Sequence, residues 1–197
     1  MSKKSVTLLE LLIAMVLLGV VVLTFASIEN FGRFHTINAS KRAKVQNEVT
    51  FTLEHIGKNM RRAVGDINNP PIQRLADGVR IRIDANTPAT PGIFTDDVFF
   101  DYRLSANTLN FSCIPAGDPR CPSDEALSGK IVSGVSFFLS PNPASGLSLN
   151  IVDPGPNGGS GLEIILLGRY DPASAASVDN PQVMLKSRFH TYSTAFK

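Results

Sequence analysis

Glu10 carries the only charged side chain between Val6 and Ile28, in a run of apolar residues. A carboxylate at the centre of a bilayer costs about 2.5–3.5 kcal/mol, and less near the interface, so intramembrane acids usually have a partner and a function. Alternatively, the Glu10 side chain could extend to the headgroups near Lys4. The residue itself leaves both interpretations open.

The apolar run from Val6 to Ile28 is long enough to cross a membrane, since a helix of this length covers roughly the 30 Å of hydrocarbon. Lys3 and Lys4 precede the run and place the N-terminus in the cytoplasm. A cleaved secretory signal is the alternative, but its apolar core spans only about 7–15 residues. We therefore expect residues 6–28 to be a membrane anchor in the inner membrane and the residues after Ile28 to lie in the periplasm.

The N-terminus combines two lysines, Ser5, an apolar residue, a threonine, two aliphatic residues and a glutamate. This pattern resembles the class III leader of type IV prepilins and type II secretion pseudopilins. The resemblance implies that a prepilin peptidase cleaves between Ser5 and Val6 and that Val6 becomes N-methylated. Two positions depart from the family, which nearly always has Gly at Ser5 and often has Pro at Ser27. The implied assembly residues are Thr7, Leu8, Leu9, Glu10 and Gly19.

Cleavage after Ser5 would remove Lys3 and Lys4 and leave 17 basic and 17 acidic side chains. The resemblance implies that Glu10 neutralises the new N-terminus of a neighbouring subunit, which hides two costly charges in one ion pair. It also implies other pilins or pseudopilins, prepilin peptidase, an inner-membrane assembly platform and membrane lipid as partners. The neutral mature charge does not indicate nucleic-acid binding.

The remaining sequence predicts an α+β fold. Apolar residues at helical spacing between Val45 and Val64 extend the helix, as its amphipathic half over residues 29–65, with a plausible hinge within Asn30–Lys44. We expect this stripe to pack on the chain's own sheet rather than to form a coiled coil. An antiparallel sheet in residues 66–197 then follows from alternating runs separated by Pro and Gly clusters, one of them at 153–161. The predicted strands are Val79–Ile83, Val98–Leu104, Leu109–Cys113, Ile131–Leu139, Leu147–Val152, Leu162–Tyr170 and Val183–Tyr192.

Cys113 and Cys121 are too few ligands for a zinc site, and they either form a disulfide or remain free thiols. No metal or other cofactor is expected. Calcium is the alternative, because its ligands are oxygens, although neither candidate spacing matches a ligand pattern. The candidate ligands are Asp153 with Asn157, and Asp118 with Asp124 and Glu125.

The histidines and the aspartates of the predicted sheet are expected at the surface rather than in a catalytic site. His35, His55 and His190 lie far apart in the sequence without metal-binding spacing, and we expect them to be exposed. Asp97 and Asp101 alternate with apolar residues, which predicts that both face solvent. No catalytic constellation is recognised, so the chain is not expected to be an enzyme.

The sequence favours a structural subunit, a minor pilin or minor pseudopilin, over a periplasmic enzyme or binding protein tethered by its helix. With 43% hydrophobic and 18% charged residues among 197, the chain is not a disordered protein. The end of the helix and the hairpin around residues 98–111 are similar to the minor pseudopilin J and pilus protein W group. The sequence does not distinguish a secretion system from a motility pilus or a DNA-uptake apparatus.

Overall fold

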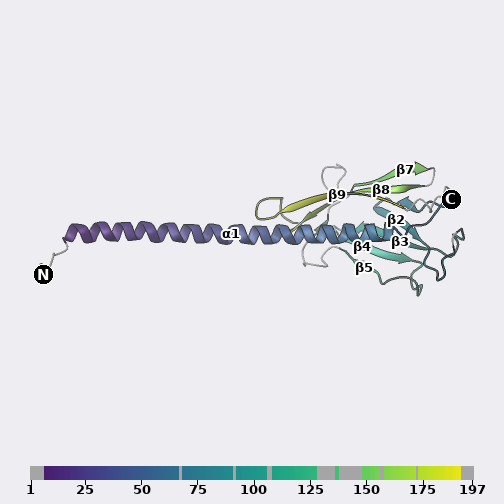
Figure 1. Ribbon diagram of the computed structural model, residues 1–197, viewed down its shortest axis with the longest axis horizontal. Helices are drawn as coiled ribbons and strands as arrows, with labels where there is room; N and C mark the ends of the chain where they lie inside the picture. Colours follow the sequence, from purple (N-terminus) through teal and green to yellow (C-terminus); the bar gives the residue numbers. More distant parts are fainter. Residues whose placement is uncertain are drawn as a thin grey trace. The chain divides into compact units, whose positions relative to one another are not determined.

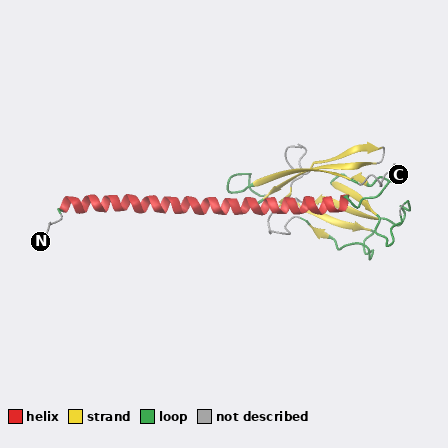
Figure 2. Cartoon of the chain, in the orientation of Figure 1, coloured by secondary structure: helices red, strands yellow, loops and turns green. Residues whose placement is uncertain are grey.

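The structure is a computed structural model that describes residues 7–66, 68–90, 92–105, 108–127, 136–137, 148–155, 158–171 and 173–191. The chain divides into two compact units, Met1–Ser40 and Lys41–Lys197. The first unit contains the N-terminal part of one long helix. The second contains the rest of that helix and an antiparallel sheet, which confirms the predicted α+β class (Figures 1 and 2).

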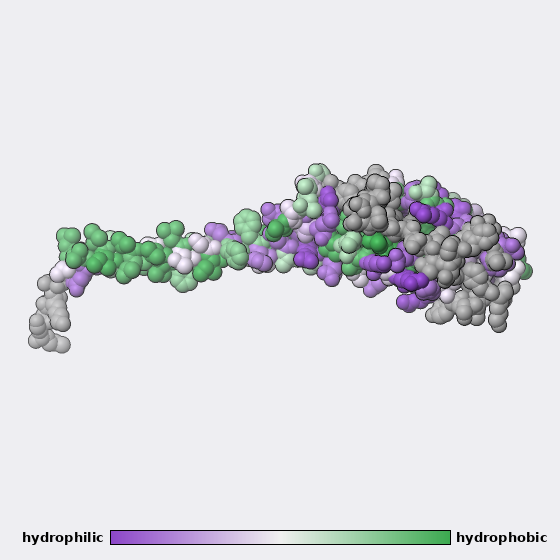
Figure 3. Space-filling model, turned by 90° about the horizontal axis from the view of Figure 1, so that it is seen from above, coloured by the Kyte–Doolittle hydropathy of each residue, from purple (hydrophilic) through white to green (hydrophobic). Residues whose placement is uncertain are grey.

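Helix α1 runs from Leu8 to Met60 and includes the Asn30–Lys44 stretch. It is the one helix in the described part of the chain that is long and apolar enough to cross a membrane. Figure 3 shows a continuous apolar surface along its N-terminal part. These side chains are exposed and pack against nothing in their own unit, as expected of a segment that requires lipid or another protein around it.

The helix ends at Met60, whereas the apolar spacing predicted that it continues to about Val64. The N–H of Ala63 donates to the carbonyl of Met60 at 3.2 Å, which tightens the last turn. Ala63 then forms a β-bridge with Ile83, and the N–H of Val64 donates to the Arg82 carbonyl at 3.0 Å. The chain leaves the helix here because the sheet provides its backbone partners.

Within the described residues, nine strands form one sheet in which all the recorded pairings are antiparallel. The order is β5-β4-β3-β2-β1-β8-β6, and β7 and β9 also pair with β8. The strands are β1 Ile72–Arg74, β2 Gly78–Ile83, β3 Val98–Ser105, β4 Thr108–Ile114, β5 Glu125–Ala126, β6 Ser136–Phe137, β7 Ser148–Gly155, β8 Gly158–Arg169 and β9 Gln182–His190.

The alternating sequence pattern located β2, β3, β4, β7, β8 and β9, but it missed the short strands β1 and β5. Most of the predicted strand Ile131–Leu139 lies outside the described residues. The glycine-rich cluster at 153–161 was expected to be a turn, yet β7 and β8 pair through it as far as Gly155 opposite Gly158. Backbone pairing therefore continues almost to the tip of this hairpin.

The predicted apolar stripe of α1 packs on the chain's own sheet. On the helix, Val45, Val49, Ile56 and Met60 are almost fully buried. Strands from both halves of the sheet supply the facing side chains, and together they form one hydrophobic core. The largest fully buried sheet side chains include Tyr102, Phe111, Ile72, Ile81, Leu109, Leu162 and Ile164.

The β8–β9 hairpin lies against the second half of α1. Gly57 permits the approach, because a Cβ at this position would lie 2.5 Å from the Phe189 ring. At the other end of the hairpin, the Lys41 ammonium donates to the Asp179 carbonyl at 2.9 Å and lies 5.4 Å from the centre of the Tyr170 ring. The hairpin is thus attached to the helix at both ends.

Candidate functional site

Thr7 and Glu10 form a reciprocal cap at the start of α1. The Thr7 N–H and hydroxyl donate to Oε2 of Glu10 at 2.9 and 3.1 Å, and the Glu10 N–H donates to the Thr7 hydroxyl at 3.3 Å. This is the capping box, whose signature is a threonine followed three residues later by glutamate. The spacing of Thr7 and Glu10 in the sequence is the signal that identifies this cap.

The cap gives Glu10 a partner inside its own chain. Negative charge in the first turn of a helix is also favourable to the helix dipole. Among the described residues, all three bonds of this cap involve Oε2 or the Glu10 N–H, so Oε1 has the capacity to accept a further donor. Glu10 is therefore positioned by Thr7 and can still accept a positively charged group. The expected cleavage site, Ser5 and Val6, lies outside the described residues.

The other predicted assembly residues lie on the open surface of the first unit. Leu8 and Leu9 are 84% and 67% exposed. A Cβ at Gly19 would meet no atom within 4 Å, so packing within the described chain does not require glycine there. The structure therefore leaves all three positions available to a neighbouring molecule.

The apolar surface of α1 continues beyond the predicted membrane segment. Phe31, Phe34 and Ile37 follow at intervals of three residues and are exposed. Glu29 and Arg33 form an ion pair at 2.6 Å along the same stretch, so charged and aromatic side chains alternate here. Residues 29–65 were predicted to be one amphipathic segment, and this aromatic extension was not predicted.

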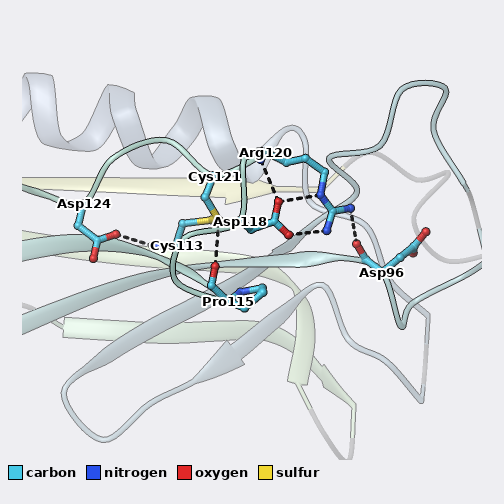
Figure 4. The surroundings of a disulfide bond; sticks show 7 residues. All are labelled: Asp96, Cys113, Pro115, Asp118, Arg120, Cys121 and Asp124. Atoms are coloured by element: carbon cyan, nitrogen blue, oxygen red, sulfur yellow. Dashed lines mark hydrogen bonds and ion pairs between the residues drawn. A yellow bond between two sulfur atoms is a disulfide. The ribbon is translucent and has the colours of Figure 1, made fainter.

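Cys113, at the end of β4, forms a disulfide with Cys121 (Figure 4). The N–H of Cys113 donates to the carboxylate of Asp124 at 3.0 Å. Inside the loop, Arg120 makes two hydrogen bonds to Asp118, from Nε at 2.9 Å and from Nη2 at 2.6 Å. These bonds from the Arg120 side chain, with one from its backbone N–H, lower the pKa of Asp118 to about 2.

Arg120 also connects the disulfide loop to the loop between β2 and β3. Its Nη1 donates to the Asn86 side chain at 2.6 Å and to the Asp96 carbonyl at 2.7 Å. Figure 4 shows the guanidinium between Asp118 and Asp96. Three bonded partners on two loops make Arg120 the link between the segments.

The calcium candidates do not meet at one point. Arg120 occupies both oxygens of Asp118, the Cys113 N–H binds Asp124, and Glu125 lies 3.7 Å from His55. Across the described residues, no group of three or more His, Cys, Asp or Glu side chains is placed to hold a metal. The other candidate pair, Asp153 and Asn157, has no described side chains.

Asp101 was predicted to face solvent, and this was wrong, because its side chain is only 1% exposed. Arg80 lies directly opposite on β2 and donates to both carboxylate oxygens, at 2.7 and 2.9 Å. Arg103 adds two more bonds to Oδ2, from Nη2 at 3.2 Å and from Nε at 3.4 Å. The arginine side chains cover this face of the sheet and exclude water from the carboxylate.

Asp97 was also expected to be exposed and is buried. Its carboxylate lies 3.7 Å from the buried Arg82 guanidinium, and its Oδ2 accepts no hydrogen bond from the part of the chain that the structure describes. Burial raises the pKa of Asp97 to about 6, and the charges of Asp84 and Asp96 add to the effect while Arg82 opposes it. The alternation of polar and apolar residues in the sequence did not predict that Asp97 is buried beside Arg82.

His35 and His190 are exposed as expected, but His55 is partly buried. Its Nδ1 lies 3.0 Å from the Tyr102 hydroxyl, which also accepts a bond from Asn59 at 2.6 Å. Burial raises the pKa of Tyr102, so its hydroxyl remains protonated and can donate to His55. This network connects α1 to β3 in the interior, and Glu125 on β5 lies beside it.

Comparison with known proteins adds one finding. Residues 1–26 match the family model described as the prokaryotic N-terminal methylation motif. The match covers the capped start of α1 and supports a prepilin-like chain that is anchored in a membrane and processed by prepilin peptidase. No curated protein and no solved structure gave a match.

Proposed function

We propose that this chain is a minor pseudopilin or minor pilin, a structural subunit of a filament of the type II secretion or type IV pilus kind. The observation that carries the proposal is the methylation motif, which leads directly into an apolar helix whose surface has no partner in its own unit. In this role the helix first lies in the membrane and then packs among the helices of other subunits.

Assembly depends on Glu10 in this proposal. Cleavage after Ser5 creates a positively charged amine at Val6, which needs a counter-charge once this end of the helix leaves the polar headgroups and enters an apolar environment. Glu10 of an adjacent subunit provides it, since Thr7 fixes one carboxylate oxygen and leaves the other free to accept. Burial in hydrocarbon makes such an ion pair selective for the correctly placed neighbour.

The proposed position is that of a minor subunit with its sheet domain in the periplasm. The Cys113–Cys121 disulfide favours an oxidising compartment, which agrees with the orientation expected from Lys3 and Lys4. Ser5 in place of Gly and Ser27 in place of Pro favour a minor over a major subunit. The similarity to the pseudopilin J and pilus protein W group supports the same choice.

Glu10→Val tests this function, with Leu12→Val as the matched control in the same apolar turn. Both variants should insert into the membrane, because neither adds a charge to the helix. We expect Glu10→Val to lose incorporation into filaments when expressed with the other subunits, and Leu12→Val to retain it. Equal incorporation of the two variants would contradict the role of Glu10, and absence of the unmodified chain from filaments would contradict the filament role and favour a simple tether.

A further inference from the structure

We propose that the outer edge of β9 accepts an extended acidic segment of another protein as an additional strand of the sheet. This interaction is separate from helix-mediated filament assembly and does not depend on it. It would give the sheet domain a binding partner of its own. The proposal rests on three features of β9: a backbone edge with which no described strand pairs, an adjacent groove and a basic rim.

The free edge follows from the pairing of β9. This strand pairs with β8 along its whole length, from Gln182 opposite Arg169 to His190 opposite Gly161. On its other side no strand pairs with it in the part of the chain that the structure describes. A nine-residue edge strand presents many unpaired backbone groups and is a template for another strand.

The hydrogen bond from the Tyr170 N–H to the Pro181 carbonyl, at 3.2 Å, fixes which groups point outward. In an antiparallel ladder, residue pairs alternate between bonded and non-bonded, and the non-bonded residues direct their N–H and C=O away from the partner. Continuing the alternation from Pro181 puts odd-numbered residues toward β8. The outward groups belong to Gln182, Met184, Lys186, Arg188 and His190.

A groove of about 400 Å³ lies beside this edge, between α1 and β9. The strand contributes Leu185, Ser187 and Phe189 to its wall, and the helix contributes Leu53 and Gly57. An added strand directs alternate side chains to one face, so every second residue of the incoming segment can enter the groove. Its lining suits apolar side chains at these positions.

The rim of the groove and the edge are basic. Lys58 and Arg61 line the groove together with Glu54. On β9, Lys186 is paired with Glu163 of β8 at 3.0 Å, and Arg188 adds a further cation, so basic side chains outnumber acidic ones here. A second copy of β9 paired at this edge would place these cations near one another, which is destabilising. An acidic strand at this edge would instead place negative charges next to these cations, which is favourable. The edge therefore disfavours self-pairing and favours a segment in which acidic and apolar residues alternate.

The probe for this proposal is a fluorescein-labelled peptide of alternating Glu and Val, added to the full chain in detergent micelles. A Lys-Val peptide of equal length is the control for charge. We expect fluorescence anisotropy to show binding of the acidic peptide only. Residue-resolved hydrogen exchange should slow at the outward amides of Met184, Lys186 and Arg188. Binding without this protection, or no binding, would overturn the proposal.

Arg188→Pro removes one outward N–H but no bond to β8, and edge strands tolerate proline in this orientation. Arg188→Ala removes the charge and keeps the N–H, so it is the matched control. We expect binding to weaken at least tenfold more in the proline variant than in the alanine variant. Unchanged protection of the inward Ser187 amide verifies that the hairpin is intact. Equal affinities of the two variants would refute strand addition.

This test is distinguishable from a test of the filament role. Arg188→Pro lies far in sequence from the N-terminal motif, so the variant should still be cleaved before Val6 and incorporated through Glu10. Loss of peptide binding with normal incorporation is the expected combination.

Discussion

The carboxylate of Glu10 accepts hydrogen bonds from both the backbone N–H and the hydroxyl of Thr7, at 2.9 and 3.1 Å. The acid in the apolar segment is thus not an isolated charge before assembly. Its own chain stabilises it and fixes its orientation at the first turn of α1. Thr7 of the methylation motif therefore has a structural role, because it caps the helix and holds the Glu10 carboxylate in place.

Thr7→Ala should disorder the first turn of α1, because the hydroxyl that accepts from the Glu10 N–H is lost. Loss of such a cap costs about 1 kcal/mol. We expect faster hydrogen exchange of the Glu10 amide in micelles, measured by NMR, and near-normal exchange in Thr7→Ser, which retains a hydroxyl. Identical exchange in Thr7→Ala and the unmodified chain would show that the cap contributes nothing.

Replacing Cys113 and Cys121 together with serine should lower the free energy of unfolding by about 2–3 kcal/mol, since the closed loop is short. Urea unfolding of the full chain in micelles, followed by circular dichroism, measures the change. The unmodified chain with reductant should lose a similar amount. No loss in either sample would mean that the disulfide does not form.

Asp101→Asn should destabilise the sheet by about 3 kcal/mol, because it leaves the partly buried Arg80 guanidinium without its counter-charge. The control is Arg103→Ala, whose side chain is 44% exposed and whose loss should cost under about 1 kcal/mol. The same urea unfolding measurement compares them. Comparable small effects of both changes would contradict the assignment of Arg80–Asp101 as the principal pair.

Deprotonation of Asp97 should lower the stability of the folded state as the pH rises from about 4 to about 6. Its pKa is raised in the folded protein, so the folded state binds its proton more tightly than the unfolded state does. The contribution of Asp97 to the free energy of unfolding is complete below the pKa that Asp97 has in the unfolded chain. It is lost as the pH rises through the pKa that Asp97 has in the folded protein. A raised pKa of this size corresponds to up to about 3 kcal/mol.

The comparison with Asp97→Asn isolates this contribution from the other carboxylates, because the asparagine does not titrate. Unfolding free energies of both chains should be measured at several values between pH 4 and pH 7. We expect the unmodified chain to lose stability relative to Asp97→Asn over this interval. A difference that is constant with pH would show that Asp97 titrates normally.

The sequence predicted the parts of the fold that depend on regular spacing. The apolar stripe from Val45 to Met60 identified the buried face of the helix, and two-residue alternation identified the longer strands. It did not predict the helix end, because the competing backbone partners of Ala63 and Val64 come from β2, a strand distant in the chain.

The N-terminal motif could be recognised from sequence because its residues are consecutive. The burial of Asp101 could not be predicted, since it depends on the cross-strand position of Arg80 rather than on the alternation within β3. His55 is similar, because Tyr102 and Glu125 reach it from separate strands. A local sequence pattern predicts the burial of a side chain within one element. These networks depend instead on which residues of different elements lie opposite one another.

Processing at the N-terminus is the central claim, and the intact mass of the membrane-extracted chain tests it most directly. The chain should be expressed with and without a prepilin peptidase, and its N-terminus should be sequenced. We predict a mature chain that begins with N-methylated Val6 only when the peptidase is present. A chain that still begins with Met1 in the presence of an active peptidase would contradict the prepilin-like account.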